Sequence, residues 1–251
     1  MKGNILVLSE HKDAELDNVT LELMCKGRAM ADAWGTKLAV LVIGSEIDPV
    51  VETLKISGVD LVLTAQDAAL ADYNAELYTS VTAKAVKDFN PSLVLMGYTY
   101  LGMEVGPAVA VRSNGTMVTN CTELDVQNDK MVAARNVFGG TLQSRVEVVG
   151  PAPYMVSIEK GLLPREALPA KDAAVEALSL DLSGEILRTK IVEIISAVTG
   201  DIDITKAKIL VSVGRGIGGP EGFQELEKLA AALKGAVGAT RPPCDSEWVP
   251  N

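Results

Sequence analysis

The chain has 251 residues, a formal net charge of -10 at pH 7 and 48% hydrophobic residues. This acidity argues against binding along a nucleic-acid backbone, which depends on clustered lysine and arginine. The length predicts two domains, and a composition rich in aliphatic residues with only 4% aromatic residues is typical of α/β proteins.

The N-terminal residues, MKGNILVLSEHKD, favour a cytoplasmic protein. Their apolar run is too short for a secretion signal and acidic residues follow it at once. No uninterrupted apolar stretch of about 18 residues occurs, so we expect no membrane span. Cys25, Cys121 and Cys244 are far apart in sequence, and His11 is the one histidine that could join them. We therefore expect free, buried or half-buried thiols and no metal site.

Residues 1–159 are expected to form an α/β domain with a parallel, helix-covered sheet. Short apolar runs alternate with longer stretches in which apolar residues recur at helical spacing. Strands are predicted at 4–9, 37–44, 60–65 and 92–98, and helices at 16–34 and 74–89. This alternation is typical of βαβ units.

After residue 115 the pattern changes to partial alternation of polar and apolar residues. The segments TMVTNCTELDV, KMVAARNVFGG, TLQSRVEVVG and PYMVSIEKG predict an antiparallel extension with one wetter face. Arg135 and Arg145 flank its double-glycine turn and are expected to be exposed hairpin charges, or to meet the acidic surface of a partner.

Residues 160–206 are expected to link two domains and to contribute edge strands. The segment GLLPREALPAK contains two prolines and a glycine, which disfavour a helix or a central strand. The stretches AAVEALSLDL and RTKIVEIISAV that follow are predicted to be extended.

Residues 207–251 contain a glycine-rich loop between a predicted strand, AKILVSV, and a predicted helix. Gly214, Gly216 and Gly219 have the G-x-G-x-x-G spacing that lets backbone N–H groups approach a phosphate at a helix N-terminus. The triplet alone is a weak signal, because such spacing also serves plain strand-to-helix turns. One helix on two strands cannot bury its own faces, so we expect either that the chain is a fragment or that another subunit completes this lobe.

A nicotinamide site should have an acidic residue about 20 residues beyond the glycines. This chain has Thr240 and Arg241 at the end of the next predicted strand, where an arginine would suit a 2′-phosphate. Glu221, at the start of the helix, would repel a pyrophosphate. An NADP-dependent oxidoreductase therefore remains a weaker alternative.

The sequence resembles the electron transfer flavoprotein alpha-subunit family over nearly its whole length. The residues that carry the resemblance are VLSEHKDAEL, GYTYLGMEVGPAVAVRSNGTMVTNCTEL, ARNVFGGTLQSRV and VSVGRGIGGPEGFQELEKLAAALKGAVGATRPPCDSEWVPN. It implies an N-terminal subunit-interaction domain followed by a Rossmann-like (DHS-like) FAD-binding domain, of which 207–251 would be the first half. Family members continue with Q-V-G-Q-[ST]-G and G-I-S-G-A-x-Q-H segments, so we expect this chain to be truncated.

The resemblance implies an electron carrier rather than an enzyme that converts a substrate. Its non-covalent FAD would take electrons from acyl-CoA dehydrogenase-type flavoenzymes, as in fatty acid oxidation, and pass them to a quinone reductase or ferredoxin. The partner would be a beta subunit, as a heterodimer, that holds AMP or, in electron-bifurcating members, a second FAD. An open alternative is a structural partner of the beta subunit that holds no flavin.

The resemblance also implies a set of FAD-binding residues, namely Gly214, Arg215, Gly216, Thr240 and Arg241. The Arg241 guanidinium would lie over the isoalloxazine ring, where positive charge stabilises the negative charge that reduction adds. In the first domain, His11 is expected to be structural or interfacial, with a pH switch as the open alternative. The strand-end residues Tyr98, Tyr100 and Met103 are expected to serve packing or subunit contact, with a vestigial nucleotide crevice as the open alternative.

Overall fold

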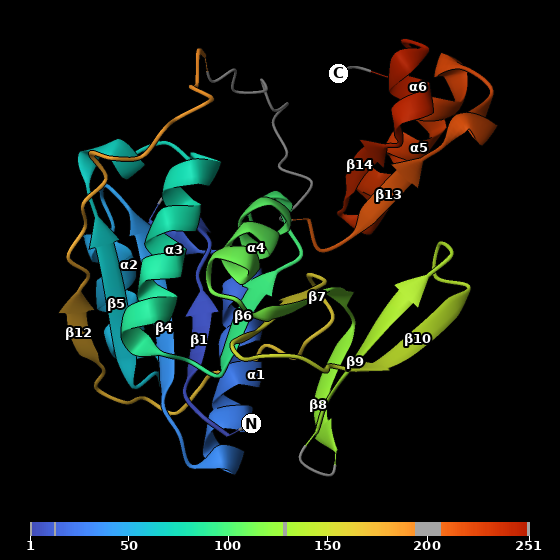
Figure 1. The fold of residues 1–251 in the computed structure, drawn as a ribbon. Helices are drawn as coiled ribbons and strands as arrows, with labels where there is room; N and C mark the ends of the chain where they lie inside the picture. Colours follow the sequence, from blue (N-terminus) through green and yellow to red (C-terminus); the bar gives the residue numbers. More distant parts are fainter. Residues whose placement is uncertain (1, 13, 128–129, 194–206, 250–251) are drawn as a thin grey trace. The chain divides into compact units, whose positions relative to one another are not determined.

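The computed structural model describes residues 2–12, 14–127, 130–193 and 207–249 (Figure 1). The chain divides into two compact units, residues 1–191 and residues 192–251. Among the described residues, no helix is both long enough and apolar enough to cross a bilayer.

The first unit is built on a seven-stranded sheet in which every neighbouring pair of strands is parallel. In order across the sheet, the strands are β12 (Ala174–Ala177), β5 (Leu61–Gln66), β4 (Leu38–Gly44), β1 (Ile5–Leu8), β6 (Leu93–Gly97), β11 (Tyr154–Ile158) and β7 (Thr116–Cys121). The predicted parallel sheet is therefore confirmed. The four predicted strands correspond to β1, β4, β5 and β6, whose continuous apolar runs reflect burial on both faces of the sheet.

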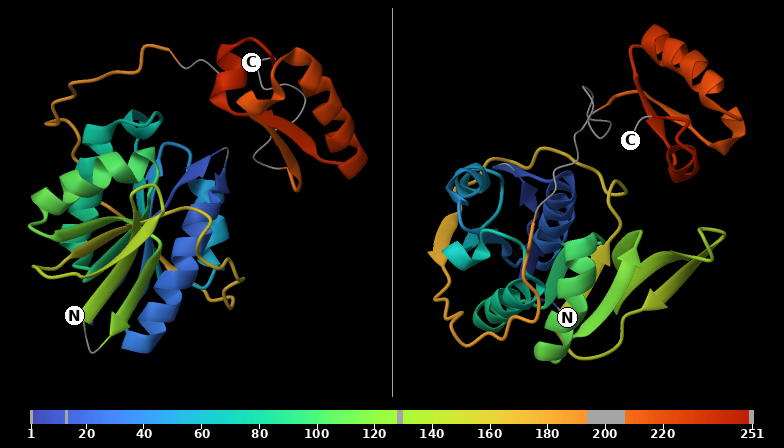
Figure 2. Two further views of the ribbon diagram at one scale, coloured as in Figure 1. Left: turned by 90° about the vertical axis from the view of Figure 1, so that its right-hand side faces the viewer. Right: turned by 90° about the horizontal axis from the view of Figure 1, so that it is seen from above.

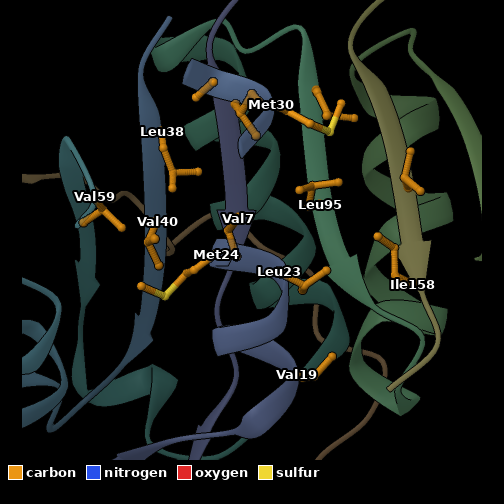
Figure 3. Packing of buried hydrophobic residues seen from close by; sticks show 14 of the residues in the cluster. Val7, Val19, Leu23, Met24, Met30, Leu38, Val40, Val59, Leu95 and Ile158 are labelled. Carbon is orange, nitrogen blue, oxygen red and sulfur yellow. The ribbon is translucent and has the colours of Figure 1, made fainter. Parts of the chain in front are cut away.

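Helices cover both faces of this sheet (Figure 2). The helices α1 (Asn18–Trp34) and α2 (Asp48–Lys55) pack on one face, and α3 (Ala75–Phe89) and α4 (Tyr100–Arg112) pack on the other. Figure 3 shows the core under α1, where Val19, Leu23 and Met30 lie near strand residues such as Val7 and Leu95. The predicted helices at 16–34 and 74–89 are confirmed as α1 and α3.

Short elements fill the connections of the first unit. They are the two-stranded pair β2 (His11–Lys12) and β3 (Glu15–Leu16), and the 3-10 turn η1 (Ala68–Leu70). The Asp17 carboxylate accepts a hydrogen bond from the Val19 amide and so caps the start of α1. Gly35, in the left-handed conformation with φ 67°, ends that helix.

The predicted antiparallel extension is correct only in its middle part. The strands β8 (Glu123–Gln127), β9 (Lys130–Val137) and β10 (Leu142–Glu147) form a three-stranded antiparallel sheet. The segments on either side, β7 and β11, instead join the main sheet as parallel strands. For β7 the mistake has a physical cause: it is the last strand of the main sheet and only Val118 and Cys121 of it are buried, so its sequence lacks the continuous apolar run of a central parallel strand.

Residues 160–191, here called the strap, run around the first unit rather than leaving it at once. Its beginning is held along α1 by charged groups. The Lys160 ammonium lies 2.8 Å from the Asp17 carboxylate, and the Gly161 N–H lies 2.9 Å and 3.2 Å from the two carboxylate oxygens of the buried Glu22. These contacts fix the direction in which the strap leaves β11.

The rest of the strap crosses to the other face of the sheet. It adds β12 to the outer side of β5 and then packs three leucines against the core beneath α3 and α4. Arg188 lies 3.5 Å from Glu76 of α3. The predicted extended stretch 188–198 forms no strand over residues 188–193, and its remainder lies outside the described residues. The division into 1–159, 160–206 and 207–251 stays a prediction.

The second unit contains the predicted strand, helix and strand. Its elements are β13 (Leu210–Val213), the 3-10 turn η2 (Arg215–Ile217), α5 (Pro220–Leu233), β14 (Ala236–Ala239) and α6 (Arg241–Asp245). Several of its apolar side chains, Ile209, Leu210, Leu229 and Leu233, are between 43% and 47% exposed. This exposure is what one helix on two strands produces, because such a layer has too little partner surface to cover both strands and helix.

Candidate functional site

Two loops of the second unit lie at the same edge of its sheet. The strands β13 and β14 are parallel neighbours, with Val213 opposite Ala239, so the segments after them begin side by side. Gly214 follows the first strand and Thr240 follows the second. The Thr240 N–H donates a hydrogen bond of 2.8 Å to the Val213 carbonyl and ties the two strand ends together. Ligands of open α/β sheets bind at this carboxyl edge.

The first of these loops is the glycine-rich turn between β13 and α5. Gly218 has φ 75°, a left-handed conformation that favours glycine, and it ends the 3-10 turn that begins after Gly214. A Cβ atom built on Gly214, Gly216, Gly218 or Gly219 would meet no heavy atom within 4 Å. The chain's own packing therefore leaves this backbone open, and a ligand can approach it closely.

The second loop carries Arg241, the cation that the family resemblance predicts to lie at a flavin. Thr240 is extended and precedes α6, so Arg241 is the first residue of that short helix. The Arg241 side chain is exposed, and its Nε lies 3.2 Å from Asp245 Oδ2 one turn later. An exposed pair of this kind holds an arginine only weakly, so the guanidinium is available to an anion. Arg215, in the first loop, is exposed as well.

A hollow of 540 Å³ lies beside the glycine-rich turn, but it does not include Arg215, Thr240 or Arg241. Its lining contains the carboxylates of Glu221 and Glu225, together with the backbone from Ile217 to Gly222. The negative charge of these two carboxylates disfavours the binding of a phosphate in this hollow. Sequence reasoning singled out Glu221 and missed Glu225, although their spacing of four residues on a predicted helix places both on one side.

The structure brings the predicted site residues together on two adjacent loops and leaves their edge open. Gly214, Arg215 and Gly216 belong to one loop, and Thr240 and Arg241 begin the other. An open backbone beside exposed guanidinium groups fits a cofactor that combines phosphates with an anion-forming ring.

The corresponding edge of the first unit is filled by its own side chains. Between β1 and β6, where the strand order reverses, the Glu10 carboxylate accepts a 2.8 Å hydrogen bond from Thr99 Oγ1. Burial raises the pKa of Glu10, against the lowering effect of that bond. A Cβ atom on Gly97 would lie 2.7 Å from Glu10 Oε1 and 2.9 Å from Val19 Cγ2. Nothing in the sequence indicated that Glu10 occupies the place where such sheets bind nucleotides.

The other residues that the sequence singled out in the first domain differ in their contacts and exposure. The His11 Nε2 lies 3.0 Å from the Ile43 carbonyl, which attaches β2 to the end of β4. Tyr98 is half-buried, whereas Tyr100 and Met103 are exposed on α4. Packing therefore does not account for Tyr100 and Met103, and subunit contact stays a prediction for them.

The hairpin arginines differ in exposure, and the cysteines differ in burial. Arg145 lies 3.5 Å from Glu123 and its side chain is exposed, as expected of a hairpin charge. Arg135 is half-buried, so the expectation of an exposed charge is wrong for it. All three cysteines are free: Cys121 is buried, and Cys25 and Cys244 are half-buried, as predicted for their burial.

Comparison with known proteins gives matches along most of the chain. The model of the electron transfer flavoprotein domain matches residues 5–183, and the model of the electron transfer flavoprotein FAD-binding domain matches residues 203–251. Protein FixB of Clostridium saccharobutylicum is 34% identical, over 98% of this chain and 74% of that protein. Electron transfer flavoprotein subunit alpha of Clostridium acetobutylicum is 33% identical over the same shares. Acryloyl-CoA reductase electron transfer subunit beta of Anaerotignum propionicum is 29% identical, over 98% and 76%.

Proposed function

The chain belongs to the electron transfer flavoprotein alpha-subunit family, and from this premise we propose that it carries electrons on a non-covalently bound FAD. The observation that carries the proposal is the FAD-binding family match to residues 203–251, the same part of the chain in which two open loops share one sheet edge. The bound flavin supplies the redox chemistry. The chain's own residues bind it, orient it and adjust its potential.

Each residue of the proposed site has a distinct role. Gly214 and Gly216 keep the backbone of the first loop open for close approach, and Arg215 adds positive charge beside it. Thr240 fixes the start of the second loop through its bond to β13. Arg241 places a guanidinium at the sheet edge, where it stabilises negative charge on a reduced ring.

The proposed partners follow from the family. We propose a heterodimer with a beta subunit that holds AMP or a second FAD, an electron donor of the acyl-CoA dehydrogenase type, and a quinone reductase or ferredoxin as acceptor. The Anaerotignum propionicum relative is named as an electron transfer subunit of an acryloyl-CoA reductase, and this supports a donor or acceptor that acts on CoA esters. The free cysteines support a reducing compartment, and we propose the cytoplasm.

The role of Arg241 is tested by the reduction potential of the flavin in the native complex. Loss of one charge-assisted interaction with the reduced ring, about 1.5–3 kcal/mol, should lower a two-electron potential by about 30–60 mV in Arg241→Ala. The matched control is Lys228→Ala, which removes an exposed cation from α5 of the same unit and should leave the potential unchanged. Equal potentials for wild type and Arg241→Ala would remove Arg241 from the site.

Flavin binding itself separates the proposal from its alternatives. A native complex with flavin absorption bands supports the carrier. A stable complex with the beta subunit in which this chain contributes no flavin supports the flavin-free structural partner. Tight NADPH binding without flavin colour supports the oxidoreductase.

A further inference from the structure

We infer that Asp245 is a positioning residue that acts through Arg241 and limits the reduction potential of the flavin. Its carboxylate holds the Arg241 guanidinium and takes up part of the positive charge that would otherwise act on the reduced ring. The inference rests on the proposed function, because it takes the ligand of Arg241 to be the flavin. Three observations carry it: the nitrogen that Asp245 contacts, the rigid backbone between the two residues and the direction of the pair along α6.

Asp245 contacts the guanidinium at its inner nitrogen. Arg241 Nε donates a 3.2 Å hydrogen bond to Asp245 Oδ2, and no described residue accepts a hydrogen bond from Arg241 Nη1 or Nη2. An arginine has five N–H donors, of which four belong to these two outer nitrogens. Within the described part of the chain, those four donors are therefore open to an anionic ring while the carboxylate stays in place.

The backbone between the two residues is rigid. Arg241 is the first residue of α6 and Asp245 is the last, in the short helix that follows β14 (Figure 1). A spacing of four positions places two side chains on one side of a helix. Pro242 and the buried Pro243 lie between them, and a proline ring restricts the backbone angle φ to about −65°. The carboxylate is therefore presented to the guanidinium before any ligand binds.

The stability of α6 does not explain this pair. The N-terminal end of a helix favours anions and the C-terminal end favours cations, and an ion pair along a helix is better when the acidic residue comes first. In α6 the cation comes first and the anion last, so each charge is at the end that disfavours it. The two side chains are also 89% and 62% exposed, and exposed ion pairs stabilise a fold little. The role of Asp245 therefore concerns what Arg241 does.

The pair distinguishes Arg241 from the other arginine of the site. Among the described residues, no carboxylate forms an ion pair with Arg215, whereas Arg241 has Asp245. A reduced flavin ring carries negative charge, so it competes with Asp245 for the guanidinium. Loss of the Asp245 charge should therefore favour the reduced flavin, whereas loss of Arg241 should disfavour it. The two substitutions are expected to change the potential in opposite directions.

The first test is an anaerobic redox titration of the native complex that carries Asp245→Asn, a variant that removes the charge and keeps the size of the side chain. At a fixed solution potential, the ratio of reduced to oxidised flavin should rise about two- to fivefold, which is about 10–20 mV for a two-electron couple. The matched control is Glu247→Gln, which removes an exposed carboxylate two residues further along the chain and should leave the ratio unchanged. An unchanged or lower ratio for Asp245→Asn would overturn the inference.

An Arg241→Ala background shows whether Asp245 acts through Arg241. In that background Asp245→Asn should have no more effect than Glu247→Gln, because the cation on which Asp245 acts is absent. An equal rise in both backgrounds would indicate a general effect of charge and would refute a role through Arg241. Circular dichroism and flavin content check that each variant is folded and loaded.

Side-chain NMR tests the contact without any flavin. In the isotope-labelled full chain, the Arg241 Nε–H should exchange with water up to about fivefold more slowly than the Arg215 Nε–H, as expected of an exposed ion pair. Asp245→Asn should abolish this difference and Glu247→Gln should not. Equal exchange of the two arginines in the wild-type chain would show that Asp245 does not hold Arg241, and the inference would be wrong.

The outcomes separate this inference from the proposed function. A native complex without flavin would refute the carrier and this inference together. A flavin-containing complex whose potential does not respond to Asp245→Asn would refute this inference alone and leave the carrier intact.

Discussion

Asp60, which precedes β5, is expected to be the most important charged residue for the stability of the first unit. Its side chain is 12% exposed and accepts hydrogen bonds of 2.8 Å from both Arg28 Nη1 and the Leu38 amide. It also pairs with Lys171 of the strap. Desolvation opposes ionisation of Asp60, but the bonds from Lys171, Leu38 and Arg28 outweigh it and lower the pKa from 3.8 to about 2.

The size of the effect follows from proton linkage. A shift of about two pKa units, at about 1.4 kcal/mol for each, is worth about 2–3 kcal/mol of unfolding free energy at pH 7. Because the folded-state pKa is the lower one, this stabilisation is present above pH 3.8 and is lost as the pH falls toward 2. Asp60→Asn should therefore cost about 2–3 kcal/mol at neutral pH and little near pH 2.

Urea unfolding followed by tryptophan fluorescence measures this cost. The chain has two tryptophans, Trp34 in the first unit and Trp248 in the second, so a Trp248→Phe background reports on the first unit alone. The matched control is Asp88→Asn, which breaks an exposed pair with Lys84 and should cost less than about 1 kcal/mol. A loss from Asp60→Asn that equals the control, or that is the same at pH 7 and pH 2, would refute the reasoning.

Three further predictions concern single positions. Asp17→Ala removes the cap of α1 and the partner of Lys160, and should lower the unfolding free energy of the first unit by about 1 kcal/mol; an unchanged urea midpoint would contradict this. Gly218→Ala should destabilise the second unit by about 1 kcal/mol, because its φ of 75° is unfavourable for alanine, and thermal unfolding followed by Trp248 fluorescence in a Trp34→Phe background tests it. Burial, partly offset by the charge of Arg135, raises the pKa of Cys121 to about 11, so a thiol reagent at pH 8 should modify Cys121 only on unfolding, whereas the half-buried Cys25 and Cys244 can react in the native chain; fast labelling of Cys121 itself, located by peptide mass, would show that the account is mistaken.

The fold of the first unit could be predicted wherever a single local pattern decides the structure. Buried parallel strands and long amphipathic helices gave clear patterns, and the resemblance to the electron transfer flavoprotein alpha-subunit family is confirmed. α2 escaped prediction because eight residues hold barely two turns, too few for a helical period to stand out. The parallel pairing of β7 and β11 also escaped, because pairing partners distant in sequence leave no mark on local alternation.

The strap shows a second limit of local patterns. Its prolines correctly indicated that it forms no helix. The sequence did not reveal that the carboxylate of Glu22, on a helix distant in sequence, accepts hydrogen bonds from the Gly161 N–H. Buried carboxylates that bind distant backbone groups look like surface residues in a sequence. The half-buried Glu10 was overlooked as well, because its carboxylate accepts a hydrogen bond from the side chain of Thr99, a residue distant in sequence.

The sequence predicted which residues belong to the candidate site, but only part of how they are arranged. The spacing of the glycines and the resemblance together selected Gly214, Gly216, Thr240 and Arg241. The structure adds that the loops carrying them follow neighbouring parallel strands, a consequence of the right-handed strand-helix-strand connection. Whether these residues bind FAD stays a prediction.

The most direct test of the proposed carrier is the visible absorption spectrum of this chain, purified from its native host with its second subunit and then reduced anaerobically by its electron donor. The account predicts flavin bands that scale with the amount of this chain, bleach on reduction and weaken or shift in Arg241→Ala. A pure, folded complex in which this chain contributes no flavin absorption would contradict it.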